Sequence, residues 1–362
     1  MHISELDTPA LVIDLDIMER NLRRVAEYCK GHGLRLRPHT KTHKVPAVGR
    51  RQLDSGAIGL TVAKVGEAEV MLGANPPDLL VAYPVFGRAK LERLMKVAKK
   101  TNVTVAVDSL GVAQQLSDAA REAQVEIGVL AEVDAGLNRV GVSPGPELME
   151  LARGLTRLPN LRFEGIDFYP GHIRDTGERG EEQIRKVSEM VQCILDDFRR
   201  DGIEVRVVSG GSTPSLFHSH EVKGLNEIRP GTYVYNDVNT VASGACTFDD
   251  CAVSIVVTVV STARPGQIIV DGGSKTFSSD TAAAPSVHGR IVESPESAFF
   301  RENEEHGYVD VTQAKRDFAV GEQLHIIPAH VCTAVNLHEY VYGTRGTQVE
   351  QVWKVEGRGK LQ

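Results

Sequence analysis

The sequence predicts an α/β fold: a (β/α)8 barrel of the TIM type followed by a separate all-β domain. Between about residues 30 and 240, short apolar runs alternate with longer amphipathic runs, and this alternation repeats eight times. After about residue 241 the segments are β-rich, as in CAVSIVVTVVSTA, and Gly/Pro turns separate them. We therefore expect a barrel over residues 9–240 and a β domain over residues 241–362, with residues 1–8 as a candidate extra strand of the β domain.

The eight predicted strands alternate with amphipathic helices, as a parallel barrel requires. The helical segments include AKLERLMKVAKK and the long EEQIRKVSEMVQCILDDFRRDG, which ends at Gly202, a residue typical of helix C-termini. An open, doubly wound sheet is the alternative, because it is built from the same βα repeat. The strands are predicted at 34–37, 58–62, 79–83, 103–107, 127–133, 163–168, 205–208 and 227–229.

Composition narrows the classes of function. The 362 residues carry a net charge of −7, so we expect no binding to nucleic acid. No apolar run approaches the roughly 18 residues that a membrane span needs. The acidic N-terminal segment lacks the features of a signal peptide. The five cysteines are scattered without a CxxC pair, which favours a reducing compartment, and we expect a cytoplasmic protein.

A basic segment, RPHTKTHKVP over residues 37–46, follows the first predicted strand. The C-terminal ends of barrel strands are where barrel enzymes place their catalytic groups. A lysine held there among other cations and beside an apolar barrel mouth would lose its proton more easily, and its free amine can attack an aldehyde. The alternative is a solvated basic turn without a chemical role.

Two glycine-rich loops follow predicted strands seven and eight, where barrels commonly bind phosphate. Glycine lets backbone N–H groups approach a phosphate closely, and hydroxyl side chains add donors. A lysine on strand one facing two phosphate loops indicates pyridoxal phosphate, an aldehyde that carries a phosphate. The predicted cofactor contacts in these loops are Ser209, Gly210, Gly211, Ser212, Thr213, Gly231, Thr232 and Tyr233.

With these motifs together, the chain resembles the D-threonine aldolase and D-serine dehydratase family of pyridoxal-phosphate enzymes. The resemblance rests on TPALVIDLD, RPHTKTHK, EVDAGLNRVGV, SGGSTP, EIRPGTYVYND, VDGGSK and PAHVCTAVNLHE, which are spread over nearly the whole chain. It implies an alanine-racemase-like barrel with a following β domain, the arrangement called fold type III. It also implies that Lys41 binds the cofactor covalently, with Lys44 and Lys275 as the competing lysines.

Three further residues are expected at the barrel mouth. The resemblance implies that Arg139, in EVDAGLNRVGV, lies near the cofactor ring and tunes its charge. In FYPGHIRD, after strand six, Tyr169 is a candidate cofactor contact. His172 in the same segment is a candidate acid/base, although a structural histidine is an equal alternative.

The β domain contributes a candidate metal pair, His330 and Cys332 in PAHVCTAVN. At i and i+2 on an extended segment the two side chains would point to the same side. Two protein ligands leave open coordination positions for water and substrate, and a thiolate favours zinc over manganese or magnesium. HxC alone is a weak motif, and only the resemblance marks it as a metal site.

The resemblance implies a lyase that acts on β-hydroxy-D-amino acids, and the chain has features of two branches. Typical D-threonine aldolases look like HxD at the metal site, where this chain has His330 and Cys332. They also look to have a histidine six residues beyond the strand-six tyrosine, where this chain has Asp175. HxC and a histidine close to the strand-six tyrosine, here His172, resemble the dehydratase branch, which produces a 2-oxo acid and ammonia. The wording of YPGH, SGGSTP and RPGTYVYND favours the aldolase branch. We therefore expect retro-aldol cleavage to glycine and an aldehyde, with dehydration as the alternative.

Two other classes remain as alternatives. A racemase would need a catalytic tyrosine from the β domain of a partner subunit, for which Tyr340 and Tyr342 are candidates. A non-catalytic pyridoxal-phosphate carrier would resemble the barrel alone. The resemblance also implies a homodimer in which the β domain of the partner completes the site.

Overall fold

The computed structural model describes residues 1–283 and 286–362, and it divides the chain into two compact units. One unit contains residues Arg24–Gly231 together with Gly359–Gln362. The other contains Met1–Arg23 together with Thr232–Arg358. These boundaries differ from the predicted 9–240 and 241–362, because the N-terminal segment belongs with the β-rich part of the chain.

The first unit is built on eight parallel strands in the order β2-β9-β8-β7-β6-β5-β4-β3. A parallel bridge between His39 and Thr61, with hydrogen bonds from Thr40 N to Thr61 O (2.8 Å) and from Thr61 N to Pro38 O (2.9 Å), joins the two ends and closes the barrel. The (β/α)8 prediction is confirmed, and the open sheet is excluded. The strands are β2 (Arg35–Leu36), β3 (Leu60–Val62), β4 (Asp78–Val81), β5 (Asn102–Val107), β6 (Ile127–Val133), β7 (Leu161–Phe168), β8 (Val207–Gly210) and β9 (Glu227–Ile228).

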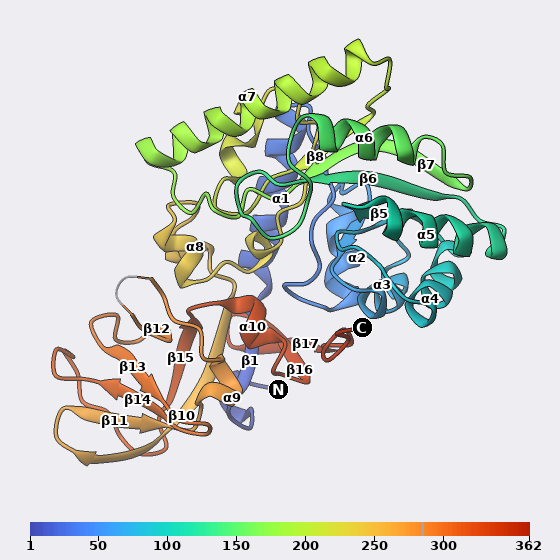
Figure 1. Ribbon diagram of the computed structural model, residues 1–362. Coiled ribbons are helices and arrows are strands. Elements are labelled where there is room, and N and C mark those ends of the chain that lie inside the picture. Colours follow the sequence, from blue (N-terminus) through green and yellow to red (C-terminus); the bar gives the residue numbers. More distant parts are fainter. Residues whose placement is uncertain (284–285) are drawn as a thin grey trace. The chain divides into compact units, whose positions relative to one another are not determined.

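Helices cover the outside of the parallel strands (Figure 1). Side chains from alternate strands fill the interior: Leu80 of β4, Leu130 of β6 and Val207 of β8 form one buried cluster. All seven residues of β6 are buried, as expected for a strand between a barrel interior and a helix layer. The helices are α1 (Leu15–Gly31), α2 (Pro46–Asp54), α3 (Val65–Met71), α4 (Arg88–Ala98), α5 (Leu110–Ala123), α6 (Pro146–Leu155) and α7 (Glu178–Arg200), of which α1 runs from one unit into the other.

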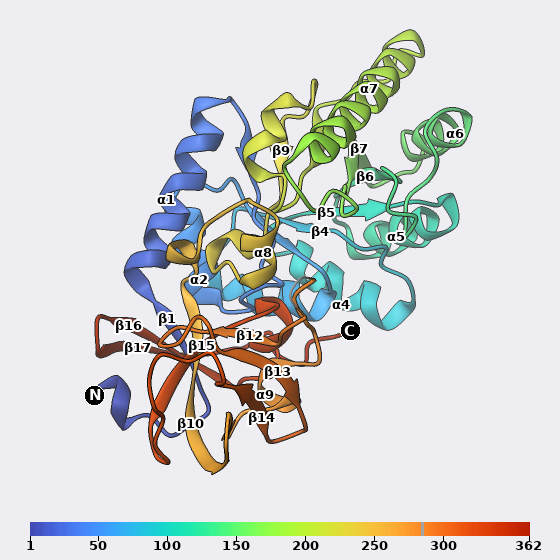
Figure 2. The same ribbon diagram turned by 90° about the vertical axis from the view of Figure 1, so that its left-hand side faces the viewer.

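The second unit is a mainly antiparallel β domain with the strand path β13-β14-β11-β10-β1-β16-β17, and β15 pairs with β10 and β12. Its longest strand, β10 (Val253–Arg264), is visible in orange in Figure 2. The other strands are β11 (Gln267–Val270), β12 (Gly289–Ile291), β13 (Ala298–Glu302), β14 (Gly307–Asp310), β15 (Gln323–Pro328), β16 (Tyr340–Arg345) and β17 (Gln348–Lys354). Three short helices, α8 (Val238–Ala242), α9 (Ser274–Phe277) and α10 (Val331–Val335), interrupt them.

The N-terminal contribution to the β domain is a central strand. β1 (Ala10–Asp14) lies between β10, to which it is antiparallel, and β16, to which it is parallel. Residues 1–8, the predicted extra strand, instead form a short 3-10 helix (Ile3–Glu5) and a single bridge from His2 to Gln348. The apolar run ALVI is buried on both faces, so the strand belongs to the core rather than to an edge.

No helix in the described part of the chain is both long enough and apolar enough to cross a membrane.

Candidate active site

The segment after β2 is anchored so that Lys41 lies at the end of the barrel where the strands terminate. His39 N donates to Pro230 O (3.0 Å), and the Lys41 amide donates to His39 Nδ1 (3.3 Å). Lys41 is half-buried, and its Nζ lies 5.6 Å from the centroid of the Tyr169 ring. Lys41 and Tyr169, far apart in sequence, are therefore neighbours, as the predicted site requires.

The two competing lysines are engaged elsewhere. Lys44 has a left-handed backbone conformation (φ 54°), and its buried Nζ forms an ion pair with Glu67 Oε1 at 3.2 Å. Lys275, in the β domain, is exposed and pairs with Glu305 at 2.7 Å. Neither amine has the half-buried position beside an aromatic ring that Lys41 has.

The two histidines of this segment are not the cations that the sequence suggested. Burial, and then the charges of Lys41 and Arg229, hold the pKa of His39 well below 6.5. Burial lowers the pKa of His43 to about 4, and its ring bonds the Val45 amide (3.1 Å) and Gln52 (3.2 Å). Both rings are neutral at pH 7, so the two histidines near Lys41 do not add positive charge around its amine.

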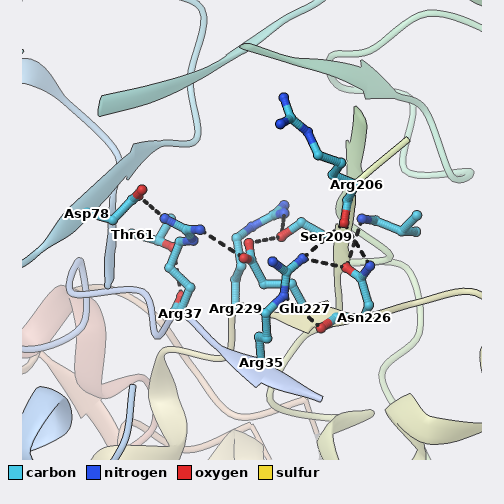
Figure 3. Close-up of polar contacts among 10 residues, drawn as sticks. Arg35, Arg37, Thr61, Asp78, Arg206, Ser209, Asn226, Glu227 and Arg229 are labelled. Carbon is cyan, nitrogen blue, oxygen red and sulfur yellow. Dashed lines mark hydrogen bonds and ion pairs between the residues drawn. The ribbon is translucent and has the colours of Figure 1, made fainter. Parts of the chain in front are cut away.

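A network of buried charges lies among the strands of the barrel (Figure 3). Arg37 contacts both Asp78 and Glu227, and Glu227 also accepts a hydrogen bond from the Ser209 hydroxyl (2.7 Å). Arg229 forms an ion pair with Asp167 (3.2 Å) and donates to the Ser209 hydroxyl (2.6 Å). This network was not predicted from the sequence, although charged residues inside otherwise apolar strands indicate it.

Ser209 was predicted to contact the phosphate, but its hydroxyl is committed to this network. The side chain is fully buried and is shared between Glu227 and Arg229. Ser209 lies near the end of β8, next to the glycine loop, and its contact with the phosphate stays a prediction.

Glu132 and Asp167 are two buried acids in the same interior. Leu130 belongs to the interior cluster, so Glu132, two residues along β6, points to the same side. Burial, and then the nearby charge of Asp167, raise the pKa of Glu132 to about 8. Burial also raises the pKa of Asp167 to about 6, against the opposing effect of Arg229. Glu132 is therefore mainly a neutral acid at pH 7.

We expect Glu132→Gln to stabilise the cofactor-free protein at pH 8 relative to pH 5. The folded state keeps a proton on Glu132 up to about pH 8, whereas the unfolded state loses it near 4.5, so the stability of the wild type falls across that window. The neutral amide removes this loss, which is worth on the order of 3 kcal/mol between pH 5 and pH 8, or about 4 °C in melting temperature. Thermal scans at both pH values check this, with the exposed Glu150→Gln as control. An equal shift at pH 5 and pH 8 would contradict it.

Arg139 and His172 lie on the loops around Tyr169. The guanidinium of Arg139 is 5.0 Å from the centroid of the Tyr169 ring, on the loop between β6 and α6. His172 packs against Gly136 of that loop so closely that a Cβ on Gly136 would lie 3.2 Å from the ring. The buried Nδ1 of His172 has no hydrogen-bond partner in the described part of the chain, and burial lowers the pKa of this histidine. Arg139 and Tyr169 are therefore neighbours, and His172, on the loop after β7, is neutral and able to accept a proton.

Asp175 occupies the position, six residues beyond Tyr169, at which the resemblance to typical aldolases leads one to expect a histidine. Its carboxylate accepts hydrogen bonds from Gly177 N and Gly180 N, both at 3.2 Å, at the start of α7. The side chain thus satisfies free N–H groups at a helix N-terminus. At this position the chain uses the residue to begin a helix.

The two glycine loops are closely packed cradles. A Cβ on Gly210 would lie 2.5 Å from the Phe168 ring, and Gly211 has φ +85°, which glycine tolerates best. A Cβ on Gly231 would lie 2.9 Å from Thr42 Oγ1 and 3.0 Å from His39 O. The second loop therefore packs directly against the segment that carries Lys41. Ser212 and Thr213, in the first loop, are buried, and Ser212 bonds Ser215 (3.0 Å).

These features fit pyridoxal phosphate. The half-buried amine beside an aromatic ring, the arginine over that ring and two glycine loops at one end of the barrel match an aldehyde with a phosphate. Thr232 and Tyr233, the remaining predicted phosphate contacts, begin the β-rich unit. There Tyr233 is buried, and Thr232 Oγ1 lies 3.7 Å from Cys332 Sγ.

We expect Gly211→Ala to weaken cofactor binding by roughly tenfold or more, because a side chain at φ +85° moves the amides that are predicted to face the phosphate. Gly202→Ala is the matched control: it also has positive φ (+70°), but it lies at the end of α7 with open space around it. Both variants should lose about 1 kcal/mol of stability without cofactor. Cofactor titration separates them, and equal affinities would mean that Gly211 serves the turn alone.

The candidate metal pair lies at the start of α10, and its geometry differs from the prediction. His330 is extended (φ −136°), but the helix begins at Val331, so Cys332 is helical rather than part of an extended segment. The alternation argument is therefore wrong for this pair, yet the side chains still meet. The pKa of His330 is raised to about 9, first by its hydrogen bond with Cys332 and also by Asp280. His330 and Cys332 are therefore neighbours because of a helical turn and not because of an extended segment.

Other polar groups hold this turn in place. Val331 N donates to Asp237 Oδ2 (2.9 Å), and His330 Nδ1 bonds Asp280 Oδ2 (2.7 Å). In the described part of the chain, no group of three or more His, Cys, Asp or Glu side chains is arranged to hold a metal. That His330 and Cys332 hold an ion stays a prediction.

Comparison with known proteins agrees with this architecture. Residues 13–238 match the family model "Alanine racemase, N-terminal domain", and residues 252–344 match the model "Putative serine dehydratase domain". A 3-hydroxy-D-aspartate aldolase of Paracoccus denitrificans is 32% identical over 99% of this chain and 94% of its own length. The crystal structure of a D-threonine aldolase from Filomicrobium marinum has a TM-score of 0.91, with 32% identity over 99% of this chain and 98% of that one.

A dehydratase is almost as similar. The structure of the D-threo-3-hydroxyaspartate dehydratase from Delftia sp. HT23 has a TM-score of 0.90 and 29% identity, and the match covers 98% of both chains. A cysteine-to-alanine variant of that enzyme is described as metal-free. The fold and the matched models define an alanine-racemase-like protein. The chain belongs to the pyridoxal-phosphate-dependent lyase family in which an alanine racemase N-terminal domain is joined to a serine dehydratase domain.

Proposed function

We propose that this chain is a pyridoxal-phosphate- and metal-dependent lyase that cleaves β-hydroxy-D-amino acids, as a D-threonine aldolase does, to glycine and an aldehyde. The observation that carries the proposal is the similarity at 32% identity, over 99% of the chain, both to an enzyme named as an aldolase of 3-hydroxy-D-aspartate and to one named as an aldolase of D-threonine. The shared substrate type is a D-amino acid with a hydroxyl on its β-carbon.

The residues of the barrel would serve the amino group and the α-carbon. Bound pyridoxal phosphate withdraws electrons from the α-carbon of an amino acid, which permits bonds at that carbon to break. Lys41 would hold the cofactor covalently and exchange it with the substrate amine. Arg139 would fix the ring from the side of Tyr169, and the Gly211 and Gly231 loops would hold the phosphate. His172, neutral and at the same barrel mouth, would move a proton.

His330 and Cys332 would hold one divalent ion. Zinc suits an imidazole and a thiolate best, and manganese or magnesium are the alternatives. Such an ion lowers the pKa of a bound hydroxyl, which favours retro-aldol cleavage when a base takes the hydroxyl proton. The two-ligand set leaves room for that hydroxyl.

Dehydration to a 2-oxo acid and ammonia is the second candidate, and specific observations favour it. The proposed metal pair contains a cysteine, and a structure of a D-threo-3-hydroxyaspartate dehydratase describes a cysteine-to-alanine variant in the metal-free form. Asp175 binds backbone amides at the start of α7, so the chain has no imidazole at the position where a histidine is expected of an aldolase. A racemase or a carrier has no comparable support among these relatives.

The product formed from D-threonine decides between the two. An aldolase gives acetaldehyde and glycine, whereas a dehydratase gives 2-oxobutanoate and ammonia. Both pairs are measured in one incubation with cofactor and zinc, and L-threonine serves as the control substrate. Acetaldehyde in excess supports the proposal; 2-oxobutanoate in excess replaces it with the dehydratase.

We also expect a homodimer of about 79 kDa, twice the 39.4 kDa of the chain. The exposed aromatic side chains Tyr83 and Phe86 follow β4, at the end of the barrel where Lys41 lies, and apolar surface of this kind is common at subunit interfaces. Light scattering during size exclusion measures the mass. A fully active species of 39.4 kDa would contradict the expectation. A cytoplasmic location stays a prediction from cysteine usage.

A further inference from the structure

The carboxylate of Asp280 lies against the His330 ring. Asp280 Oδ2 is 2.7 Å from His330 Nδ1, and the same oxygen accepts a hydrogen bond from Thr333 Oγ1 at 2.9 Å. The carboxylate is 46% exposed, so holding it there is not needed to satisfy a buried charge. Its placement requires another explanation.

A small set of hydroxyl groups holds this carboxylate. Thr333 Oγ1 also lies 3.1 Å from His330 O, and the Ser278 hydroxyl donates to Thr333 Oγ1 at 3.0 Å. Asp280 N donates to the Ser278 hydroxyl at 3.3 Å, which closes the ring of contacts. The acid, the threonine and the serine thus fix one another on one side of the imidazole.

The contact sets the tautomer of His330. A carboxylate can only accept, so the Nδ1 that faces it carries a proton, and once the proton on Nε2 is displaced, Nε2 is the nitrogen left to bind a metal ion. A histidine that binds a metal through one nitrogen commonly donates its other N–H to a carboxylate, which orients the ring and makes it a better ligand. His330 is the N-cap of α10 and Cys332 lies in its first turn, so the thiol and the imidazole belong to the same turn.

We propose that Asp280 is a positioning residue for the metal site: it holds the His330 ring with Nε2 directed to the ion, without binding the ion itself. This inference rests on the proposed function, because it assumes that His330 and Cys332 bind a metal. It adds a residue that neither the HxC motif nor the sequence identified. Asp280 lies 50 positions before His330, in a segment without a recognisable pattern.

A second acid, Asp237, shows what a purely structural role looks like here. It is buried, accepts from Thr240 N (2.8 Å) and Thr240 Oγ1 (2.6 Å), and binds the backbone of Val331. Asp237 therefore supports the main chain, and its loss should unfold the turn. Asp280 touches a side chain and is half-exposed, so its loss should spare the fold.

The test measures zinc affinity by competition with a chromophoric chelator, using the full-length holoenzyme and no activity assay. Asp280→Ala should bind zinc about 10- to 100-fold more weakly than the wild type, the usual effect of removing such a partner. Asp280→Asn keeps a neutral acceptor and should lie between the two. The exposed Asp317→Ala is the matched control and should bind as the wild type does.

Each outcome decides between distinct readings. If the wild type binds no zinc, or if His330→Ala binds it normally, the metal part of the proposed function fails. If His330→Ala loses zinc but Asp280→Ala keeps wild-type affinity, the positioning role alone is overturned. A loss in Asp280→Ala as complete as that in His330→Ala would also overturn it, because Asp280 would then be a ligand. Melting temperatures of the zinc-free variants detect misfolding, in which case Asp280→Asn provides the answer.

Discussion

Lys41→Ala is expected to abolish covalent attachment of pyridoxal phosphate and to lower turnover at least about 1,000-fold, because the two competing lysines, Lys44 and Lys275, are engaged elsewhere. Lys44 is held by Glu67 in a buried ion pair, and Lys275 is exposed in the β domain. The visible absorbance of covalently bound cofactor should disappear, while the melting temperature without cofactor stays close to that of the wild type. Lys41 is only half-buried, so little packing is lost.

Borohydride reduction followed by peptide mapping locates the attachment directly. The label should be on the peptide that contains Lys41. Lys275→Ala is the control, because it removes an exposed amine and should leave labelling intact. A label on Lys44 or Lys275 would show that the cofactor is bound elsewhere.

Cys332→Ala should remove the metal and lower turnover of β-hydroxy-D-amino acids by about 100-fold or more, since one of the two proposed protein ligands is lost. Chelation of the wild type should have the same effect without releasing the cofactor or unfolding the protein. Metal content by mass spectrometry and turnover before and after chelation check both statements. Full activity and metal content in Cys332→Ala would mean that the thiol is only a packing residue at the start of α10.

Cys332→Asp is the sharper test, because it introduces the HxD pair expected at the metal site of typical aldolases. A carboxylate is a harder ligand than a thiolate, so the preferred ion should change from zinc toward manganese or magnesium. If the wild type dehydrates D-threonine, the ratio of products should also move toward acetaldehyde and glycine. An unchanged metal preference would show that the thiolate does not select the ion.

The barrel could be predicted from sequence because its signal is local. Each strand is a short apolar run beside an amphipathic helix. Seven of the predicted strands therefore overlap the observed ones closely, and the strand predicted at 205–208 is observed two residues later, as β8 (Val207–Gly210). Lys41 could be singled out for a similar reason: its segment directly follows a strand, and the strand end defines the catalytic face.

Features that depend on distant segments could not be predicted. The ion pairs of Arg37 and Arg229 join residues of different strands, and no local pattern says which acid each arginine meets. The orientation of His330 and Cys332 depends on where α10 begins, and the strand-like letters before it gave no sign of a helix. Asp280 reaches His330 across 50 residues of sequence.

The central position of β1 bears on how the protein is made. Residues 10–14 leave the ribosome early, whereas their partners on β10, residues 253–256, follow about 240 residues later. At elongation rates of about 5–20 residues per second, this strand waits roughly 10 to 50 seconds for its neighbour, time in which the barrel segment can emerge and fold. Until then the nascent chain presents an unpaired apolar strand, a natural target for chaperones. A truncation that removes residues 10–14 would leave β10 and β16 each with an unpaired edge, which favours aggregation.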